Sequence, residues 1–367
     1  MKLNIRSLLR NDLETWLGKQ GEARYRVDQI LDWLYDRRVR DWAAMTNLSR
    51  PLRESLAAEF DLGLPEPVRE QGAWDTTQKY LWRLSDGAFI ESVLIPANTG
   101  EDGEASSRKT LCVSTQVGCA YGCRFCASGL DGWKRHLDPH EIVGQVIAAE
   151  LEIQNHLMDS GSEAERKPSR QIDNLVFMGM GEPLANYDNL MTALSILNAE
   201  WGMGIGARRI TISTSGLVPQ IKQLADEPPQ FRLAISLHGP TNEVRERIMP
   251  VNRKYPIEEL AEACEYYVRK RGKMITLEYI LIEDVNDALE LTDDLADLAM
   301  RLRAKVNLIP YNTVEGLEWR RPSLEQQQRF YLALKQRGVN VTLRREKGHD
   351  IDAACGQLRL KAEKEIA

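Results

Sequence analysis

Apolar side chains near the start of the chain have helical spacing. In residues 22–39 (EARYRVDQILDWLYDRRV) apolar and aromatic positions recur at intervals of three or four. Residues 47–60 (NLSRPLRESLAAEF) place Ser49 where it can cap a helix and Pro51 in the first turn. These patterns predict that the chain begins with several short helices.

The period then changes to that of β-strands. Strand-like runs are found at residues 79–85, 88–96, 110–116, 174–180, 209–214, 231–237, 274–282, 305–310 and 340–345. From residue 110 onward, helical patterns separate these runs, among them residues 140–156, 256–272 and 323–338. About six strand–helix units predict a parallel sheet, built either as a partial or full barrel or as an open doubly wound sheet. In each of these architectures, chemistry gathers at the carboxyl ends of the strands.

The changes in pattern divide the chain into three predicted parts. Residues 1–62 form a helical accessory domain, residues 63–109 a linker with a β extension, and residues 110–367 the strand–helix core with its C-terminal segment. The core is interrupted by a hydrophilic insertion at residues 159–171, which we expect to be a surface loop.

Composition and charge restrict the possible partners. The 367 residues are 43% hydrophobic and 28% charged, and no run approaches the length of a membrane span or a signal peptide, so we expect a cytoplasmic protein without a membrane partner. The formal net charge of −6 at first disfavours a nucleic acid. Residues 301–347 nevertheless hold eleven Lys or Arg against four Asp or Glu, and residues 36–40 and 268–273 are also basic. This distribution permits a polyanionic partner.

Three of the six cysteines lie within eight positions, in the segment VGCAYGCRFCASG. Cys119, Cys123 and Cys126 follow the first strand of the core with the spacing C-x3-C-x2-C. A disulfide would leave one thiol unpaired, and structural zinc needs a fourth ligand that no Cys or His supplies at finger spacing. Three thiolates on a short loop with two glycines suit an iron–sulfur cluster with one iron left open to a ligand.

These residues resemble the signature of the radical S-adenosylmethionine (SAM) enzymes, in which an aromatic residue, here Phe125, precedes the last cysteine. The resemblance implies a partial (βα)6 barrel, a [4Fe–4S] cluster on Cys119, Cys123 and Cys126, and SAM bound to the open iron. The segment MGMGEPLAN (178–186) follows a predicted strand and is similar to the GGEP-like motif of that superfamily.

Further segments resemble the RlmN/Cfr family of radical SAM RNA adenosine methyltransferases. They span nearly the whole chain in order: YRVDQILDWLY, MTNLS, CVSTQVGCAYGCRFCASG, MGMGEPLANYDN, RRITISTSGLVP, LAISLH, VNRKYPIEEL, VNLIPYN and DIDAACGQL. The resemblance implies that Cys355 carries the methyl group as S-methylcysteine, that Cys112 resolves the RNA adduct through a transient disulfide with Cys355, and that Glu91 accepts the ring proton. Two SAM molecules would be consumed per turnover.

The resemblance also implies contacts and partners. Residues at matching motif positions would bind SAM: Gly181, Glu182, Ser213, Ser236, Leu237, His238 and Asn312. The expected partners are 23S ribosomal RNA, transfer RNA and an electron donor such as a flavodoxin or ferredoxin, and the expected state is a monomer. Near the N-terminus, Arg37, Arg38 and Arg40 with Tyr35 and Trp42 are compatible either with RNA contact or with packing against the core.

Two alternatives remain open at this point. The RlmN members methylate C2 of adenosine and the Cfr members C8, and we favour C2 because the N-terminal segments are closer to RlmN. A different class is also possible, namely a non-catalytic RNA-binding protein with structural zinc. Cys264, inside a predicted amphipathic helix, matches no motif of the family and is expected to be structural.

Overall fold

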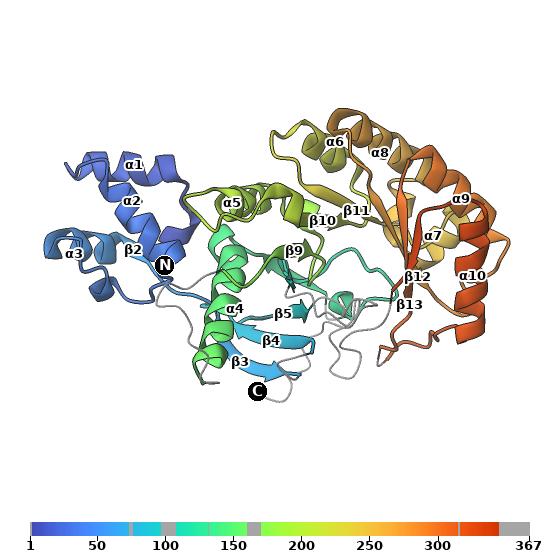
Figure 1. Cartoon of the computed structure of the whole chain (residues 1–367), viewed down its shortest axis with the longest axis horizontal. Helices are drawn as coiled ribbons and strands as arrows, with labels where there is room; N and C mark the ends of the chain where they lie inside the picture. Colours follow the sequence, from blue (N-terminus) through green and yellow to red (C-terminus); the bar gives the residue numbers. More distant parts are fainter. Residues whose placement is uncertain are drawn as a thin grey trace.

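The computed structural model describes residues 2–72, 76–96, 108–130, 132–159, 170–314 and 316–344. Its centre is a mixed sheet with the strand order β14-β13-β12-β11-β10-β9-β6-β5-β4-β3 (Figure 1). The strands of the sheet are β3 (Glu66–Gln71), β4 (Gln78–Arg83), β5 (Phe89–Pro96), β6 (Lys109–Cys112), β9 (Asn174–Phe177), β10 (Ile210–Thr214), β11 (Arg232–Ser236), β12 (Thr276–Leu281), β13 (Lys305–Pro310) and β14 (Val341–Leu343). All pairs from β6 to β14 are parallel, whereas β3, β4, β5 and β6 pair antiparallel.

Each barrel strand from β6 to β13 is followed by a helix that covers the outer face of the sheet (Figure 1). The helices are α4 (Pro139–Asp159), α5 (Tyr187–Asn198), α6 (Val218–Asp226), α7 (Asn242–Ile248), α8 (Ile257–Arg271), α9 (Leu291–Arg301) and α10 (Leu324–Gln336). Six parallel strand–helix units whose sheet ends at β14 form an open barrel. The predicted partial (βα)6 barrel with a β extension is therefore confirmed.

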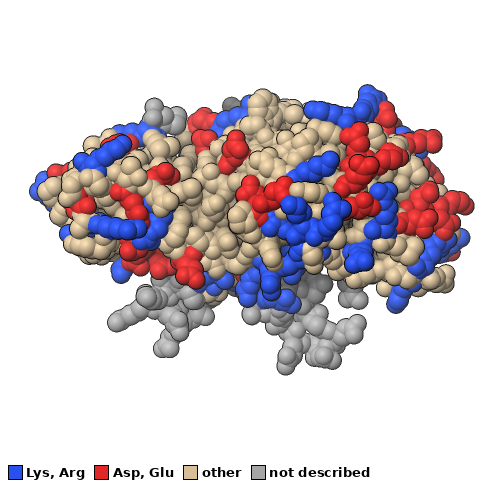
Figure 2. Space-filling view, turned by 90° about the horizontal axis from the view of Figure 1, so that it is seen from above, with Lys and Arg blue, Asp and Glu red and all other residues tan. Residues whose placement is uncertain are grey.

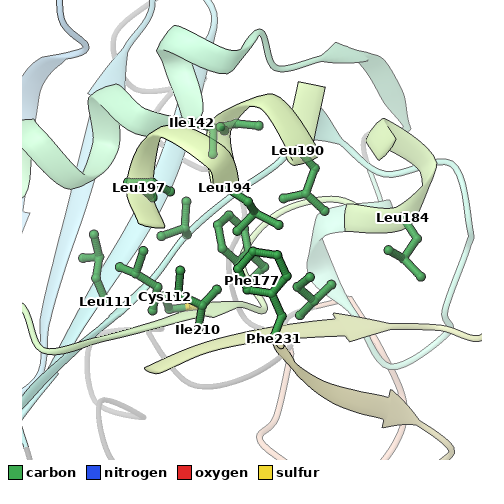
Figure 3. Close-up of a cluster of buried hydrophobic side chains, with 14 of the residues drawn as sticks. Leu111, Cys112, Ile142, Phe177, Leu184, Leu190, Leu194, Leu197, Ile210 and Phe231 are labelled. Carbon is green, nitrogen blue, oxygen red and sulfur yellow. The ribbon is translucent and has the colours of Figure 1, made fainter. Parts of the chain in front are cut away.

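The helices are held on the barrel by apolar side chains that alternate with those facing the interior. Leu194 and Leu197 of α5 pack in one layer with Leu111, Phe177 and Ile210 of the strands (Figure 3). All five are completely buried. This layer fixes the position of β9, whose carboxyl end leads into the MGMGEPLAN segment.

The N-terminal segment is helical, as its apolar spacing predicts. Its elements are η1 (Ile5–Ser7), α1 (Arg10–Lys19), α2 (Arg26–Leu31), η2 (Asp32–Asp36), η3 (Trp42–Ala44) and α3 (Arg50–Glu59), and a short parallel pair, β1 (Leu3–Asn4) with β2 (Phe60–Asp61), joins its two ends. The cap predicted at Ser49 is present, since its hydroxyl accepts a hydrogen bond from the Leu52 amide at 3.4 Å. No described helix has the length and apolar character that a membrane crossing requires.

This segment docks on the barrel through buried contacts. Arg38 forms a buried ion pair with Glu150 of α4 at 3.6 Å, and Tyr35 packs edge-to-face on Trp201 with ring centroids 6.0 Å apart. Of the two roles considered for this region, packing therefore accounts for Tyr35 and Arg38, which a bound RNA could not reach. Arg37 and Arg40 are exposed.

The strand predicted over residues 110–116 ends earlier than its composition indicates. β6 stops at Cys112, and a separate antiparallel hairpin begins with β7 (Gln116–Gly118) and closes with β8 (Trp133–His136). Ser114 lies between β6 and β7. The side chain of Gln145 on α4 accepts a hydrogen bond from the Ser114 amide at 2.9 Å and donates one to the Ser114 carbonyl at 3.0 Å. The Ser114 hydroxyl donates to the Glu91 carbonyl of β5 and accepts from the Met180 amide. Side-chain hydrogen bonds thus take the place of backbone hydrogen bonds to β5 where the chain turns away from the sheet.

The edge strand β3 was not predicted. Its sequence EPVREQ is polar, contains a proline and is almost fully exposed, so it has no alternation of buried and exposed positions. Residues 97–107 and 160–169, which include most of the predicted surface insertion, lie outside the described residues.

Removing the Gln145 amide tests the junction after β6. The substitution Gln145→Ala leaves the buried amide and carbonyl of Ser114 without these partners, which should lower the free energy of unfolding by about 2–4 kcal/mol. The measurement is urea unfolding followed by circular dichroism. The matched control is Asn155→Ala at an exposed position of α4, expected within about 0.5 kcal/mol of the wild type. Equal losses in both variants would contradict the assigned role.

Candidate active site

A cavity of about 860 Å³ lies at the carboxyl ends of the barrel strands. Its walls come from the cysteine loop, from the segment after β9 and from the ends of β10 to β13. The polar residues that line it include Cys119, Cys123, Cys126, Glu182, Ser213, Ser236, His238 and Glu278. The structure therefore brings together in one space residues from Cys119 to Ile309, which are 190 positions apart in sequence, as expected for the carboxyl end of such a barrel.

The loop with the three cysteines is fixed at both of its ends. The Cys119 amide donates to the Gly132 carbonyl at 3.1 Å, and the Arg124 amide donates to the carbonyl of Ile248 at the end of α7 at 2.9 Å. Gly118, with φ of +74°, is required where the loop begins, because a Cβ there would lie 1.9 Å from the Gly132 carbonyl oxygen. The three sulfurs are thereby presented to the cavity.

Burial affects the acidity of these thiols. It raises the pKa of Cys119 to about 12 and that of Cys123 well above its ordinary value, and the nearby sulfur of Cys126 raises both further. Cys119 and Cys123 are therefore protonated until a cation replaces their protons. Binding of iron at this loop should release protons and should stabilise the fold of the loop.

The donor set fits an iron–sulfur cluster. Among the described residues no group of three or more His, Cys, Asp or Glu is placed to hold one metal ion. A cubane cluster requires a different arrangement of ligands from a single metal ion. Each cysteine binds its own iron, so the sulfurs need not converge on one point. Three cavity-facing thiols that influence one another's pKa meet this demand.

The Gly181–Glu182 pair closes the cavity beside the cysteine loop. Gly181 has φ of +100°, and a Cβ there would lie 2.6 Å from the Gln116 side chain. The buried Glu182 carboxylate accepts from the amides of Leu184 at 3.0 Å and Ser215 at 2.7 Å. Burial raises its pKa, and these hydrogen bonds oppose the rise. A carboxylate fixed at the cavity wall is suited to bind a ligand ammonium group.

His238 is held as a neutral hydrogen-bond donor. Its backbone has φ of +58°, and its Nδ1 accepts a hydrogen bond from the Ile280 amide at 3.1 Å, so the proton of the neutral ring is on Nε2. Burial, assisted by the charge of Arg245, lowers its pKa to about 3. The ring lies edge-to-face with Phe125 at 4.7 Å between centroids. His238 can therefore donate to a ligand without carrying charge.

Strand register places further predicted residues on the sheet face that lines the cavity. Ser213 and Ser236 share a face because Ser213 pairs with Ala234, two residues before Ser236. Cys112 pairs with Val176 and with Val93, two residues from Glu91, so it shares this face as well. Cys112 and Glu91 are also buried, but they are not part of the cavity wall.

Glu91 forms a buried ion pair with Lys79 of the neighbouring strand β4 at 3.3 Å. A cation at this distance stabilises the carboxylate form that a proton acceptor needs.

Two of the predicted SAM contacts, Leu237 and Asn312, are not among the residues that line the main cavity. The Leu237 side chain lines a small apolar cavity between β11 and α8, so only its backbone is available to a ligand in the main cavity. Asn312 lies three residues after the cavity residue Ile309, and its buried Oδ1 has no hydrogen-bond partner among the described residues. An unpaired buried oxygen of this kind is suited to a polar ligand group.

Of the predicted pair of Cys112 and Cys355, the structure describes Cys112, whereas Cys355 lies outside the described residues. No disulfide joins any two of the five described cysteines. Cys264 is completely buried on α8 among apolar side chains and lines the small apolar cavity, not the main one.

Sequence reasoning missed one cavity residue. Glu278 on β12 is buried, accepts a hydrogen bond from Asn307 at 2.7 Å, and has its pKa raised by burial. A single acidic residue inside the apolar run TLEYIL was the available signal, because a buried strand tolerates a carboxylate only at a cost.

Known proteins share both the cysteine loop and the N-terminal segment. The family model described as Radical SAM superfamily matches residues 113–296, and the model described as Ribosomal RNA large subunit methyltransferase N-terminal domain matches residues 3–62. The barrel and its cysteine loop thus define a radical SAM protein.

Similar proteins of known family show to which group of radical SAM proteins the chain belongs. A probable dual-specificity RNA methyltransferase RlmN 3 from Opitutus terrae is 57% identical over 95% of this chain and 92% of its own length. A probable RlmN from Akkermansia muciniphila is 52% identical over 96% and 94%. The crystal structure of a radical SAM methyltransferase from Sphaerobacter thermophilus superposes with a TM-score of 0.87 at 44% identity and covers 97% of this chain and 99% of its own. The chain therefore belongs to the RlmN family of radical SAM RNA methyltransferases, whose cofactors are a [4Fe–4S] cluster and SAM.

The cysteine loop can be tested by its iron content. After anaerobic reconstitution with iron and sulfide, the wild type should hold about four iron atoms per chain and absorb in the visible range, whereas Cys123→Ala should lose most of both. The control Cys264→Ala changes a buried cysteine outside the loop and should retain them. A colourless wild type that binds zinc instead would contradict the cluster assignment.

The neutral state of His238 predicts a dependence of stability on pH. Its folded pKa of about 3 lies below the ordinary value of 6.5, so only the unfolded chain takes up this proton between those values. The free energy of unfolding is therefore not reduced by this histidine above pH 6.5, and it falls as the pH is lowered toward 3 because only the unfolded chain binds the proton. His238→Asn keeps an acceptor and tolerates positive φ.

Urea unfolding from pH 6 to pH 4 should therefore show a loss of stability in the wild type that is steeper than in His238→Asn by about 1 kcal/mol per pH unit. Parallel pH profiles would show that His238 is not held neutral.

Proposed function

We propose that this protein methylates C2 of adenosine in 23S ribosomal RNA, and also in transfer RNA, by radical SAM chemistry through an S-methylcysteine. The observation that carries the proposal is the cavity itself. It combines three cluster-type thiols with a buried carboxylate, two strand-end serines and a neutral histidine donor, and Cys112 and Glu91 lie on the same sheet face.

Different residues of the chain would bind different groups of SAM. Glu182 accepts hydrogen bonds from its ammonium group beside the cysteine loop, and Ser213, Ser236 and His238 contact its ribose and carboxylate. Asn312 offers its unpaired Oδ1. When bound, the cluster, held by Cys119, Cys123 and Cys126, and SAM would supply the radical chemistry that activates the S-methyl group of Cys355.

Two cysteines outside the loop would carry the methyl group and release it. The Cys355 thiolate takes a methyl group from SAM by displacement, and its methylene carbon later becomes bonded to the adenine ring. The Cys112 sulfur then attacks the Cys355 sulfur, so that an S–S bond forms as the carbon–sulfur bond breaks. The electron pair of that bond goes to the base, which takes up a proton, and a dithiol reductant restores both thiols.

Glu91 would accept the ring proton that leaves when the adduct regains aromaticity, and the unpaired electron left by the radical addition would pass to the cluster, a one-electron acceptor. Its ion pair with Lys79 keeps it ionised for that step, and its burial shields it from competing water. The Ser114 hydroxyl contacts the Glu91 backbone and so ties this strand to the loop that carries Glu182.

The RNA partner fits the distribution of charge. On the face seen from above, Lys and Arg side chains gather near the middle of the molecule, between areas where Asp and Glu are more frequent (Figure 2). Exposed Arg37 and Arg40 of the N-terminal segment could contact phosphates. We further propose that the protein works as a monomer in the cytoplasm and receives electrons from a flavodoxin or ferredoxin.

The test is anaerobic incubation of the reconstituted enzyme with SAM, dithionite and transcripts of 23S ribosomal RNA or transfer RNA, followed by mass spectrometry of the nucleosides. We expect 2-methyladenosine from the wild type. Cys112→Ala should instead accumulate protein bound covalently to RNA, with product reduced at least about a hundredfold, because the resolving thiol is missing.

The control variants separate the roles. Cys355→Ala should form neither product nor adduct, and Cys264→Ala should behave as the wild type. Detection of 8-methyladenosine without 2-methyladenosine would replace the proposed C2 specificity by the C8 specificity of Cfr members. Normal product from Cys112→Ala would remove Cys112 from the reaction.

A further inference from the structure

Arg245 is a buried guanidinium that has no carboxylate partner among the described residues. It lies on the short helix α7 and is completely buried. Its Nη1 donates to the Asn252 side chain at 3.0 Å and its Nη2 to the Ser215 carbonyl at 2.5 Å, and both acceptors are neutral. Its Nε has no hydrogen-bond partner among the described residues.

Three other buried cations each have a carboxylate nearby. Arg38 and Lys79 form ion pairs with Glu150 and Glu91 respectively. Arg6, like Arg245, donates only to neutral acceptors, but the carboxylate of Asp61 favours its charged form. Burial of a charge is costly unless an opposite charge compensates it. For Arg245 the groups that favour the charged form are the sulfurs of Cys123 and Cys264, and no carboxylate of the described residues is among them. Among the described residues, a sulfur at one of these two positions is therefore the group that can supply a compensating charge.

Cys123 is the partner that can become anionic. Cys264 is enclosed among apolar side chains of β11, β12, α8 and α9, where burial raises the pKa of its thiol to about 12. Cys123 lies on the cavity loop and would be a thiolate ligand when the loop holds a cluster.

The same short helix also positions the loop. The carbonyl of Ile248, three residues after Arg245, accepts the Arg124 amide next to Cys123. Two glycines keep the approach open. A Cβ at Gly216 would lie 3.1 Å from Arg245 Nη2, and one at Gly239 would lie 2.5 Å from the Arg245 amide nitrogen. The helix that carries Arg245 is therefore bonded to the loop next to Cys123, and the Cys123 sulfur is the first of the groups that favour the charged form of Arg245.

We propose that Arg245 is the counter-charge of the iron–sulfur cluster at Cys123 and raises the reduction potential of that cluster. The proposal rests on the cluster assignment made under the proposed function. Uptake of one electron from a low-potential donor adds one negative charge to the cluster. A fixed cation nearby in a water-poor site stabilises the reduced form more than the oxidised form.

The test compares three variants by anaerobic redox titration with dithionite, followed by electron paramagnetic resonance of the reduced cluster. Arg245→Met removes the charge at similar volume. At a fixed potential it should lower the ratio of reduced to oxidised cluster about tenfold, which is about 59 mV for one electron. Arg245→Lys keeps the charge and should stay within about threefold of the wild type. Arg247→Met removes an exposed charge from the same helix and should leave the ratio unchanged.

Folding is checked separately on the apo proteins by circular dichroism and melting temperature. A cluster-loaded Arg245→Met with an unchanged potential would overturn the proposal, as would an Arg245→Lys variant shifted as far as Arg245→Met. If both variants fail to fold as apo proteins, Arg245 is a packing residue and the proposal is wrong. A wild type that binds no cluster would instead overturn the proposed function.

Discussion

The structure depends on how the backbone is satisfied where β6 ends. Buried amides and carbonyls must find partners, and residues 113–115 leave their antiparallel neighbour β5 while still inside the core. Gln145 and the Ser114 hydroxyl supply those partners from α4 and from the side chain itself. The Val113 and Thr115 amides donate to the carbonyls of Val176 and Met180. This junction joins the β extension, the first barrel helix and the segment with Glu182, and the cysteine loop begins directly beyond it.

Helix α4 connects this junction to the N-terminal segment. Gln145 on one side of the helix reaches the end of β6, and Glu150 reaches Arg38 of the N-terminal segment. His140 near its start contacts the Ser7 side chain at 3.2 Å. One helix therefore sets the position of the helical segment relative to the cavity. An RNA held by that segment would be registered against the active site by buried contacts.

The cavity controls the charge of its groups by burial. Thiols and the carboxyls of Glu182 and Glu278 are shifted toward their neutral forms, and His238 is held neutral from the opposite direction. Arg245 is not part of the cavity wall. Burial lowers its pKa to about 10, so it stays cationic at neutral pH although its hydrogen-bond acceptors are neutral. A site of this kind gains its charge balance only when thiolates and ligands enter, so that binding and charge compensation occur together.

The sequence by itself determined the repeating strand–helix pattern, the helical start and the C-x3-C-x2-C loop, because each depends on spacing within a few residues. Resemblance added the roles of Cys112, Cys355 and Glu91. Tertiary structure decided what depends on contacts between distant segments. It ended β6 at Cys112, added the polar edge strand β3, assigned Tyr35 and Arg38 to packing, and turned Leu237 away from the cavity.

The tertiary structure also placed Glu278 in the cavity and Arg245 beside Cys123, 122 positions away along the chain. No local pattern marks Arg245, and the local signal for Glu278 is one acidic residue inside an apolar strand. Their importance comes from burial, and which charges become neighbours in a low-dielectric interior is decided only when the barrel brings its strand ends together.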